Sequence, residues 1–131
     1  MKYFIAVIVT IVFLTSNLYS FSAKTVKAAA VKNKTIELNL VNGISSDNLG
    51  LKVSSANLAG EVKSKLSVIP LMKMFRIEKN NKARTAAALS LLKIGDARGI
   101  KVIEYASRFD DDSYVKSMCK MFYSYYLLTN S

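Results

Sequence analysis

The stretch Ala83–Asp110, ARTAAALSLLKIGDARGIKVIEYASRFD, contains two amphipathic helical patterns joined by Ile94-Gly95-Asp96. Small and aliphatic residues lie near one face of the first pattern: Ala83, Ala86, Ala87, Leu89, Leu91 and Ile94. A matching face of the second pattern holds Ile100, Val102, Ile103, Ala106 and Phe109. Gly95 can end the first helix in a left-handed conformation, and the Asp96 side chain can cap the second. Because alanines allow close approach of larger aliphatics, the stretch predicts part of a stacked helical array.

A period near 32 residues extends this pattern over most of the chain. A shift of 32 residues superimposes three segments, Leu51-Lys52, Ala83-Arg84 and Val115-Lys116. Near the N-terminal side, residues 40–44 match residues 71–75 at a shift of 31. Such a period with two helices per unit is typical of an α-solenoid. We therefore predict an all-α fold, a short α-solenoid of about three antiparallel helix pairs, with helices at about 34–44, 49–62, 66–77, 82–94, 97–109 and 112–128.

The first residues have the pattern of a secretory signal peptide. A short basic start, Met1-Lys2, precedes an apolar run over residues 3–14, and small residues allow cleavage between Ser22 and Ala23. The alternative is an uncleaved membrane anchor, but the run is shorter than the roughly 20 residues that span a bilayer. The predicted organisation is a signal peptide at 1–22, a flexible basic arm at 23–33 and the solenoid at 34–128. This predicts export, to the periplasm or the exterior, or membrane anchoring if the segment stays uncleaved.

Composition narrows the possible functions. The chain has 19 basic and 9 acidic residues, a formal net charge of +10, no histidine and a single cysteine. A lone cysteine excludes an intrachain disulfide and a thiolate metal cluster, and the commonest general base is missing. We therefore expect no enzyme activity, no cofactor and no metal site.

Three segments resemble HEAT-like repeats of the short kind also found in phycobilisome lyases. They are VIPLMKMF (Val68–Phe75), ARTAAALSLLKIGDARGI (Ala83–Ile100) and YVKSMCKMF (Tyr114–Phe122). The likeness extends from about Ser64 to Tyr123, and loosely from Thr35. It departs at one residue inserted near Leu58–Glu61 and in the bulky last helix. The resemblance implies an interaction scaffold and does not imply lyase activity.

Two sets of residues are candidates for partner binding. Lys52, Arg84 and Lys116, which we call the basic ladder, occupy one repeat position. The ladder either lines a groove for an acidic partner or binds carbonyls and acids within its own array. The last helix carries more apolar residues than one packing stripe can cover, and Tyr125, Tyr126 and Leu128 are candidates for an exposed patch. That patch either binds a partner or a second copy, or caps the end of the array.

Other polar residues have simpler expected roles. Asp110, Asp111 and Asp112 lack the spacing of a calcium loop and are expected to cap a helix and contact solvent. Cys119 aligns with Ala87 and is expected to be small and buried. An acid pair could be proposed from Glu61 with Glu78 or from Asp96 with Glu104, but nothing in their spacing brings either pair together, and each residue also suits a solvated or capping place.

These observations predict an exported helical-repeat module that binds another protein as a scaffold or adaptor. One alternative is an accessory subunit or lyase-like enzyme that uses carboxylates and lysines. Another is a structural protein of the envelope surface, in peripheral contact with anionic membrane. We expect no nucleic-acid binding, because the chain has no reader motif that combines basic and aromatic residues. A homodimer through the C-terminal helix is also compatible with the sequence.

The export prediction is tested by the intact mass of the protein released from its producing cell. Cleavage after Ser22 predicts a mature chain that begins at Ala23. A mass that still includes residues 3–14 would instead indicate a membrane anchor.

Overall fold

The computed structural model describes residues 30 and 32–130, which fall in two compact units, Met1–Ile36 and Glu37–Ser131. The predicted signal peptide lies outside the described residues, as does most of the predicted basic arm. Over the part of the chain that is described, no helix combines the length and apolar character needed to cross a membrane.

The second unit is all-α and solenoid-like, as predicted. Helical residues 37–44 lead into α2 (Leu49–Glu61), a 3-10 turn (Lys65–Ser67) and α3 (Val68–Ile77). Then follow α4 (Asn81–Ile94), α5 (Ala97–Phe109) and α6 (Ser113–Thr129). From α2 onward, these bounds differ from the predicted ones by no more than two residues. The short connections make successive helices antiparallel.

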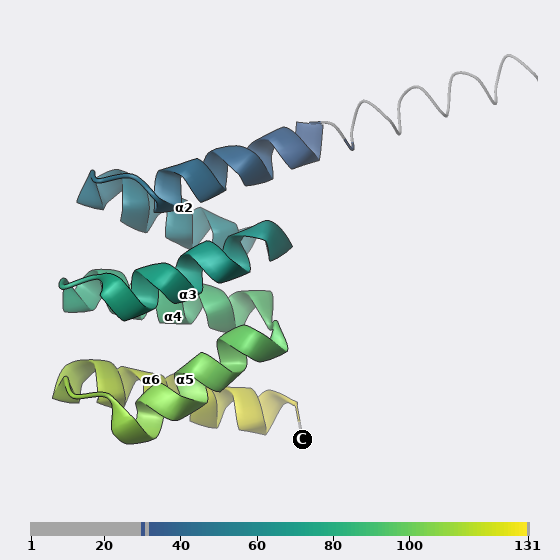
Figure 1. Cartoon of the computed structure of the whole chain (residues 1–131). Helices are drawn as coiled ribbons and strands as arrows, with labels where there is room; N and C mark the ends of the chain where they lie inside the picture. The colour runs from purple at the N-terminus through teal and green to yellow at the C-terminus, as the bar shows by residue number, and fades with distance from the viewer. Residues whose placement is uncertain (1–29, 31, 131) are drawn as a thin grey trace, which may run out of the picture. The chain divides into compact units, whose positions relative to one another are not determined.

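The helices of this unit form two layers (Figure 1). One layer contains α2, α4 and α6, in which α2 packs on α4 and α4 on α6. The other contains α3 and α5. α3 packs on α4, α5 packs on α6 and to a smaller extent on α4, and α3 and α5 barely contact each other. The space between α3 and α5 is therefore where a groove can form on the surface of the array.

The 32-residue period has a visible cause in the helix caps. The side chain that caps each helix of the first layer accepts a hydrogen bond from the amide three residues further on. The three caps lie 32 residues apart, at Asn48, Asn80 and Asp112. Gly95 ends α4 with a φ of 73°, and Asp96 caps α5, as predicted.

The core depends on small residues where α2 and α4 meet. Ala56 and Ala59 of α2, and Ala87 and Ala88 of α4, are fully buried. Gly60 comes so close to α4 that a Cβ atom there would lie 2.9 Å from the Ser90 Cα. The larger side chains fill the space toward the second layer, chiefly Val68, Leu71, Leu91, Ile100 and Ile103. Small side chains thus let α2 and α4 pack closely within one layer, while large side chains fill the space between the two layers.

One expectation about a single residue is wrong. Phe109 was assigned to the packing face of α5, but it is 61% exposed, because it follows the exposed Tyr105 by one helical turn and lies on the same side of the helix. Ser67 stands at the N-cap position of α3 without capping it. Its hydroxyl donates instead to the Ser64 Oγ, since both side chains are buried together.

The close approach at Gly60 gives a stability prediction. Gly60→Ala should lower the free energy of unfolding by about 1–3 kcal/mol, because the Ser90 backbone cannot move aside as a side chain would. The matched control is Gly50→Ala in the first turn of the same helix, where the new Cβ would meet only the Asn48 Oδ1 at 3.4 Å. That control should be neutral or stabilising by up to about 1 kcal/mol. Urea unfolding measures both, and equal losses would contradict the packing described.

Candidate functional site

An open groove of about 920 Å³ lies between α3 and α5, and we call it the α3–α5 groove. Side chains from α3, α4 and α5 and the loop after α5 line it, among them Met72, Phe75, Arg76, Arg84, Lys101, Val102, Tyr105, Phe109 and Asp111. One of the two sequence-based alternatives placed the basic ladder in a groove, and Arg84 lines this one. The other lining residues were not predicted, because the two helices that carry most of them are not consecutive.

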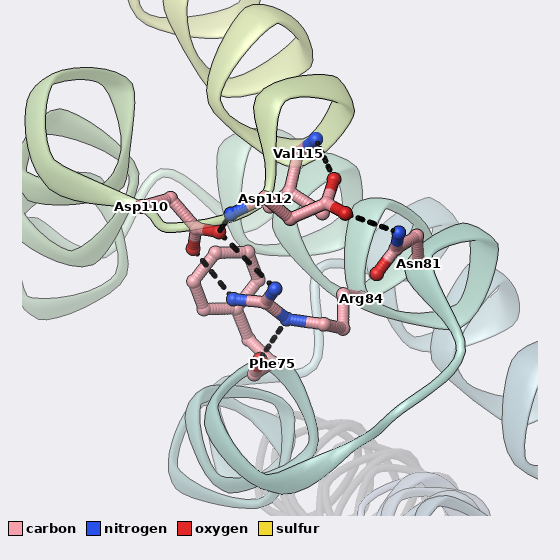
Figure 2. Close-up of polar contacts among 6 residues, drawn as sticks. All are labelled: Phe75, Asn81, Arg84, Asp110, Asp112 and Val115. Atoms are coloured by element: carbon pink, nitrogen blue, oxygen red, sulfur yellow. Dashed lines mark hydrogen bonds and ion pairs between the residues drawn. The ribbon is translucent and has the colours of Figure 1, made fainter.

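Arg84 occupies the base of the groove and connects its two sides (Figure 2). Its guanidinium binds both carboxylate oxygens of Asp110, at 3.2 Å from Nη1 and 2.5 Å from Nη2. The Arg84 Nε donates to the Phe75 carbonyl at 2.9 Å, and Cζ lies 5.0 Å from the centre of the Phe75 ring. A planar fork suits this combination of a bidentate carboxylate contact and a ring contact. Arg84 therefore ties the end of α3 to the end of α5.

The basic ladder repeats this arrangement at its first position. The Lys52 Nζ binds the Glu78 Oε2 at 2.7 Å, and that contact lowers the pKa of Glu78. Cation and acid are 26 residues apart in both cases. The positive charges of Lys52 and Arg84 are thus compensated inside the array. Lys116, by contrast, is half-buried and forms no ion pair with any described residue.

The acidic loop before α6 is part of the same network. Asp112 accepts hydrogen bonds from the Val115 amide at 2.9 Å and the Asn81 side chain at 2.6 Å, and these lower its pKa (Figure 2). The predicted capping role is confirmed for Asp112. The ion pair of Asp110 was missed, although the 26-residue spacing of Lys52 and Glu78, repeated here, is a signal that the sequence contains.

The rim of the α3–α5 groove combines exposed aromatic rings with uncompensated positive charge. Tyr105 and Phe109 are 67% and 61% exposed, and their ring centres lie 4.9 Å apart. Arg76 and Lys101 are exposed and form no ion pair within the described part of the chain. These side chains can offer apolar contact and cationic hydrogen bonding to the same ligand.

The C-terminal helix leaves much of its apolar surface open. Tyr125 and Leu128 are exposed, whereas Tyr126 is half-buried and stacks on Tyr123. Beside them, between α4 and α6, lies a second and mainly apolar groove of about 560 Å³. Leu89 and Leu92 line its α4 side, and Met121 and Phe122 its α6 side.

The cysteine and the acid pairs named from the sequence are buried or held in ion pairs. Cys119 is fully buried, and burial raises the pKa of its thiol to about 12, so the thiolate is not available at neutral pH. Each carboxylate of the suggested acid pairs binds a different cation: Glu61 with Lys93, Glu78 with Lys52, Asp96 with Arg98, and Glu104 with Arg108. Among the described residues, no three potential ligands are grouped to hold a metal ion.

Comparison with known proteins does not place the chain in a family. No protein-family model matches it, and no curated protein matches it closely enough to indicate a relationship.

The Arg84 network gives a second stability prediction. Arg84→Met should cost about 1–3 kcal/mol of unfolding free energy, because the half-buried Asp110 and the Phe75 carbonyl lose their donor. Arg84→Lys should recover only part of that loss, since an ammonium cannot span both acceptors in one plane.

The matched control for Arg84→Met is Lys93→Met. Lys93 also joins two repeat units through an ion pair, with Glu61, but on the exposed surface. Its replacement should change the urea midpoint little. Equal effects at the two positions would mean that Arg84 is only a surface contact.

Proposed function

We propose that the chain is an exported helical-repeat module of the HEAT-like kind, which binds an acidic segment of another protein along the α3–α5 groove and has no catalysis of its own. One observation supports this most directly. The unpaired cations Arg76 and Lys101 lie beside the exposed rings of Tyr105 and Phe109 in one open groove.

The chemistry of the groove favours a protein ligand. Tyr, Phe, Met and Arg are the residues that protein interfaces use most, since they combine large contact area with a few directed hydrogen bonds. Arg76 and Lys101 favour carboxylates between the apolar anchors of the ligand. Because Asp110 already neutralises Arg84, the base of the groove adds little further attraction for acids.

A smaller groove repeats this design one unit earlier. It measures about 240 Å³ and is lined by Ile44, Lys52, Lys73, Met74 and Ile77, among others. Lys73 and Ile77 lie 32 positions before Tyr105 and Phe109, so the smaller groove occupies the equivalent place one unit earlier, with Asp47 as an acid in its lining. A surface that repeats along the array suits an extended ligand segment better than a compact small molecule.

The two alternatives receive less support. An enzyme that uses carboxylates and lysines needs acids free to exchange protons, but four of the suggested acids are held in ion pairs. A structural protein at the envelope would depend on the basic arm, most of which lies outside the described residues.

Fluorescence anisotropy with a synthetic acidic peptide that carries leucine and phenylalanine tests the proposal. Protein expressed from the whole sequence should bind the peptide saturably and release it as salt rises. Arg76→Glu combined with Lys101→Glu should weaken binding by about tenfold or more, because like charges then face each other. Tyr105→Ser should weaken binding at all salt concentrations, since it removes apolar contact.

The control carries the same change of charge away from the groove, as Lys82→Glu combined with Lys120→Glu. It should retain the affinity of the parent apart from a small general loss. The proposal is wrong if a second peptide, in which lysines replace the acidic residues of the first, binds equally well. It is also wrong if the groove variants bind like the control.

A further inference from the structure

The smaller groove and the α3–α5 groove are equivalent parts of successive units, so their linings can be compared position by position. Seven residues that line the smaller groove have a counterpart that lines the larger one. The counterpart follows 31 positions later for Ile44 and Ser45, and 32 positions later for Lys52, Pro70, Lys73, Met74 and Ile77. Yet the volumes are about 240 and 920 Å³. The residue differences at these positions therefore indicate what enlarges the α3–α5 groove.

At six of the seven positions the larger groove has the bulkier residue, and the clearest cases lie at its rim. Tyr105 and Phe109, both exposed, stand where the smaller groove has Lys73 and Ile77. Bulkier exposed side chains at a rim make the walls of a groove higher. They deepen the groove, but they do not open its floor.

The seventh position is the exception, and it lies at the floor. Ala106 stands where the smaller groove has Met74, and both residues are buried members of the core. A methionine side chain continues beyond the Cβ atom through Cγ, Sδ and Cε, whereas an alanine side chain ends at Cβ. Since both residues line their grooves, Met74 occupies space that stays open above Ala106. The α3–α5 groove thus combines a low floor with high walls.

Apolar groups surround the open space above Ala106. Val102 precedes Ala106 by one turn of α5, and Phe75 lines the facing wall from α3. The Phe75 ring lies beside the Arg84 guanidinium, whose Cζ is 5.0 Å from the ring centre (Figure 2). Because Asp110 neutralises Arg84, this part of the groove presents apolar surface rather than a free charge.

The free charges of the groove lie elsewhere on its walls. Arg76 belongs to α3 and Lys101 to α5, and both side chains are exposed. A ligand can therefore place carboxylates at the walls and an apolar group at the floor. Water is the poorer occupant of the floor, because it finds few hydrogen-bonding partners among apolar side chains.

We infer that Ala106 is the floor of a subsite that takes one large apolar side chain, such as phenylalanine, from the acidic segment bound in the α3–α5 groove. This subsite rests on the proposed function, since the acidic segment supplies the side chain. It adds the residue that decides which acidic segments fit. Because Met74 fills the equivalent place one unit earlier, the segment is anchored in this way only at Ala106.

Anisotropy titrations with a series of acidic peptides test the subsite, with protein expressed from the whole sequence. The peptides are identical except at one position, which is alanine, leucine or phenylalanine. The parent protein should bind the leucine and phenylalanine peptides about tenfold or more tightly than the alanine peptide, because a large side chain buried at the centre of an interface contributes most of its affinity.

Ala106→Met should remove this preference, because the methionine then fills the space as Met74 does in the smaller groove. The phenylalanine peptide should lose about tenfold or more in affinity, whereas the alanine peptide should change little. The matched control is Ala97→Met, which makes the same substitution at an exposed position of the same helix outside the groove. It should keep the preference of the parent. An Ala106→Met protein that is folded by circular dichroism and keeps that preference overturns the subsite.

A neutral ring compound, indole, separates failure of the subsite from failure of the proposed function. In methyl NMR spectra of the parent, indole should shift the Ala106 signal saturably and leave the Ala97 signal in place. This measurement also decides the matter if Ala106→Met does not fold. If indole shifts Ala106 but no acidic peptide binds, the subsite stands and the proposed function is wrong. If the peptides bind with equal affinity and indole leaves Ala106 unshifted, the subsite is wrong and the proposed function stands.

Discussion

The close approach of α2 and α4 through small side chains is the constraint on which the remaining arrangement depends. Gly60 faces the Ser90 backbone at a distance that excludes even one additional carbon atom. Helices that pack this closely in one layer leave the bulky residues to fill the space toward the other layer. On the other layer α3 packs chiefly on α4 and α5 chiefly on α6, so these two helices make few contacts with each other and a groove lies between them.

Arg84 holds α3 and α5 at a fixed position relative to each other although they are separated. Its side chain reaches from α4 to the Phe75 carbonyl on one side and to Asp110 on the other, so the two walls are joined although their helices barely touch. A hydrophobic contact there would close the groove, whereas a long charged side chain spans it. The cost of holding a half-buried guanidinium is offset by the bidentate carboxylate and the aromatic ring below it.

Much of the fold was predictable because its signals are local. Capping residues at Asn48, Asn80 and Asp112, and the left-handed Gly95, limit each helix within one turn of sequence. The site was less predictable, because its walls come from helices that are not consecutive. The amphipathic pattern correctly placed Ile100 and Ile103 in the core but not Phe109, because Phe109 follows Tyr105 by one turn and shares its exposed side of α5. The Arg84–Asp110 pair required the 26-residue spacing to be read as a contact between units.

A repeat array gives one helical position several different environments, and this explains why exposed apolar surfaces arise without special motifs. Position 58 of α2 and position 90 of α4 are equivalent in phase, yet one is an exposed leucine and the other a buried serine. A position that is buried in one unit and exposed in another marks a side of the array where no described unit packs against it. The groove follows the same logic on the second layer, where Tyr105 and Phe109 keep apolar character without cover from the chain itself. The exposed surfaces of such an array are then defined by the positions where the repeat pattern and the burial disagree.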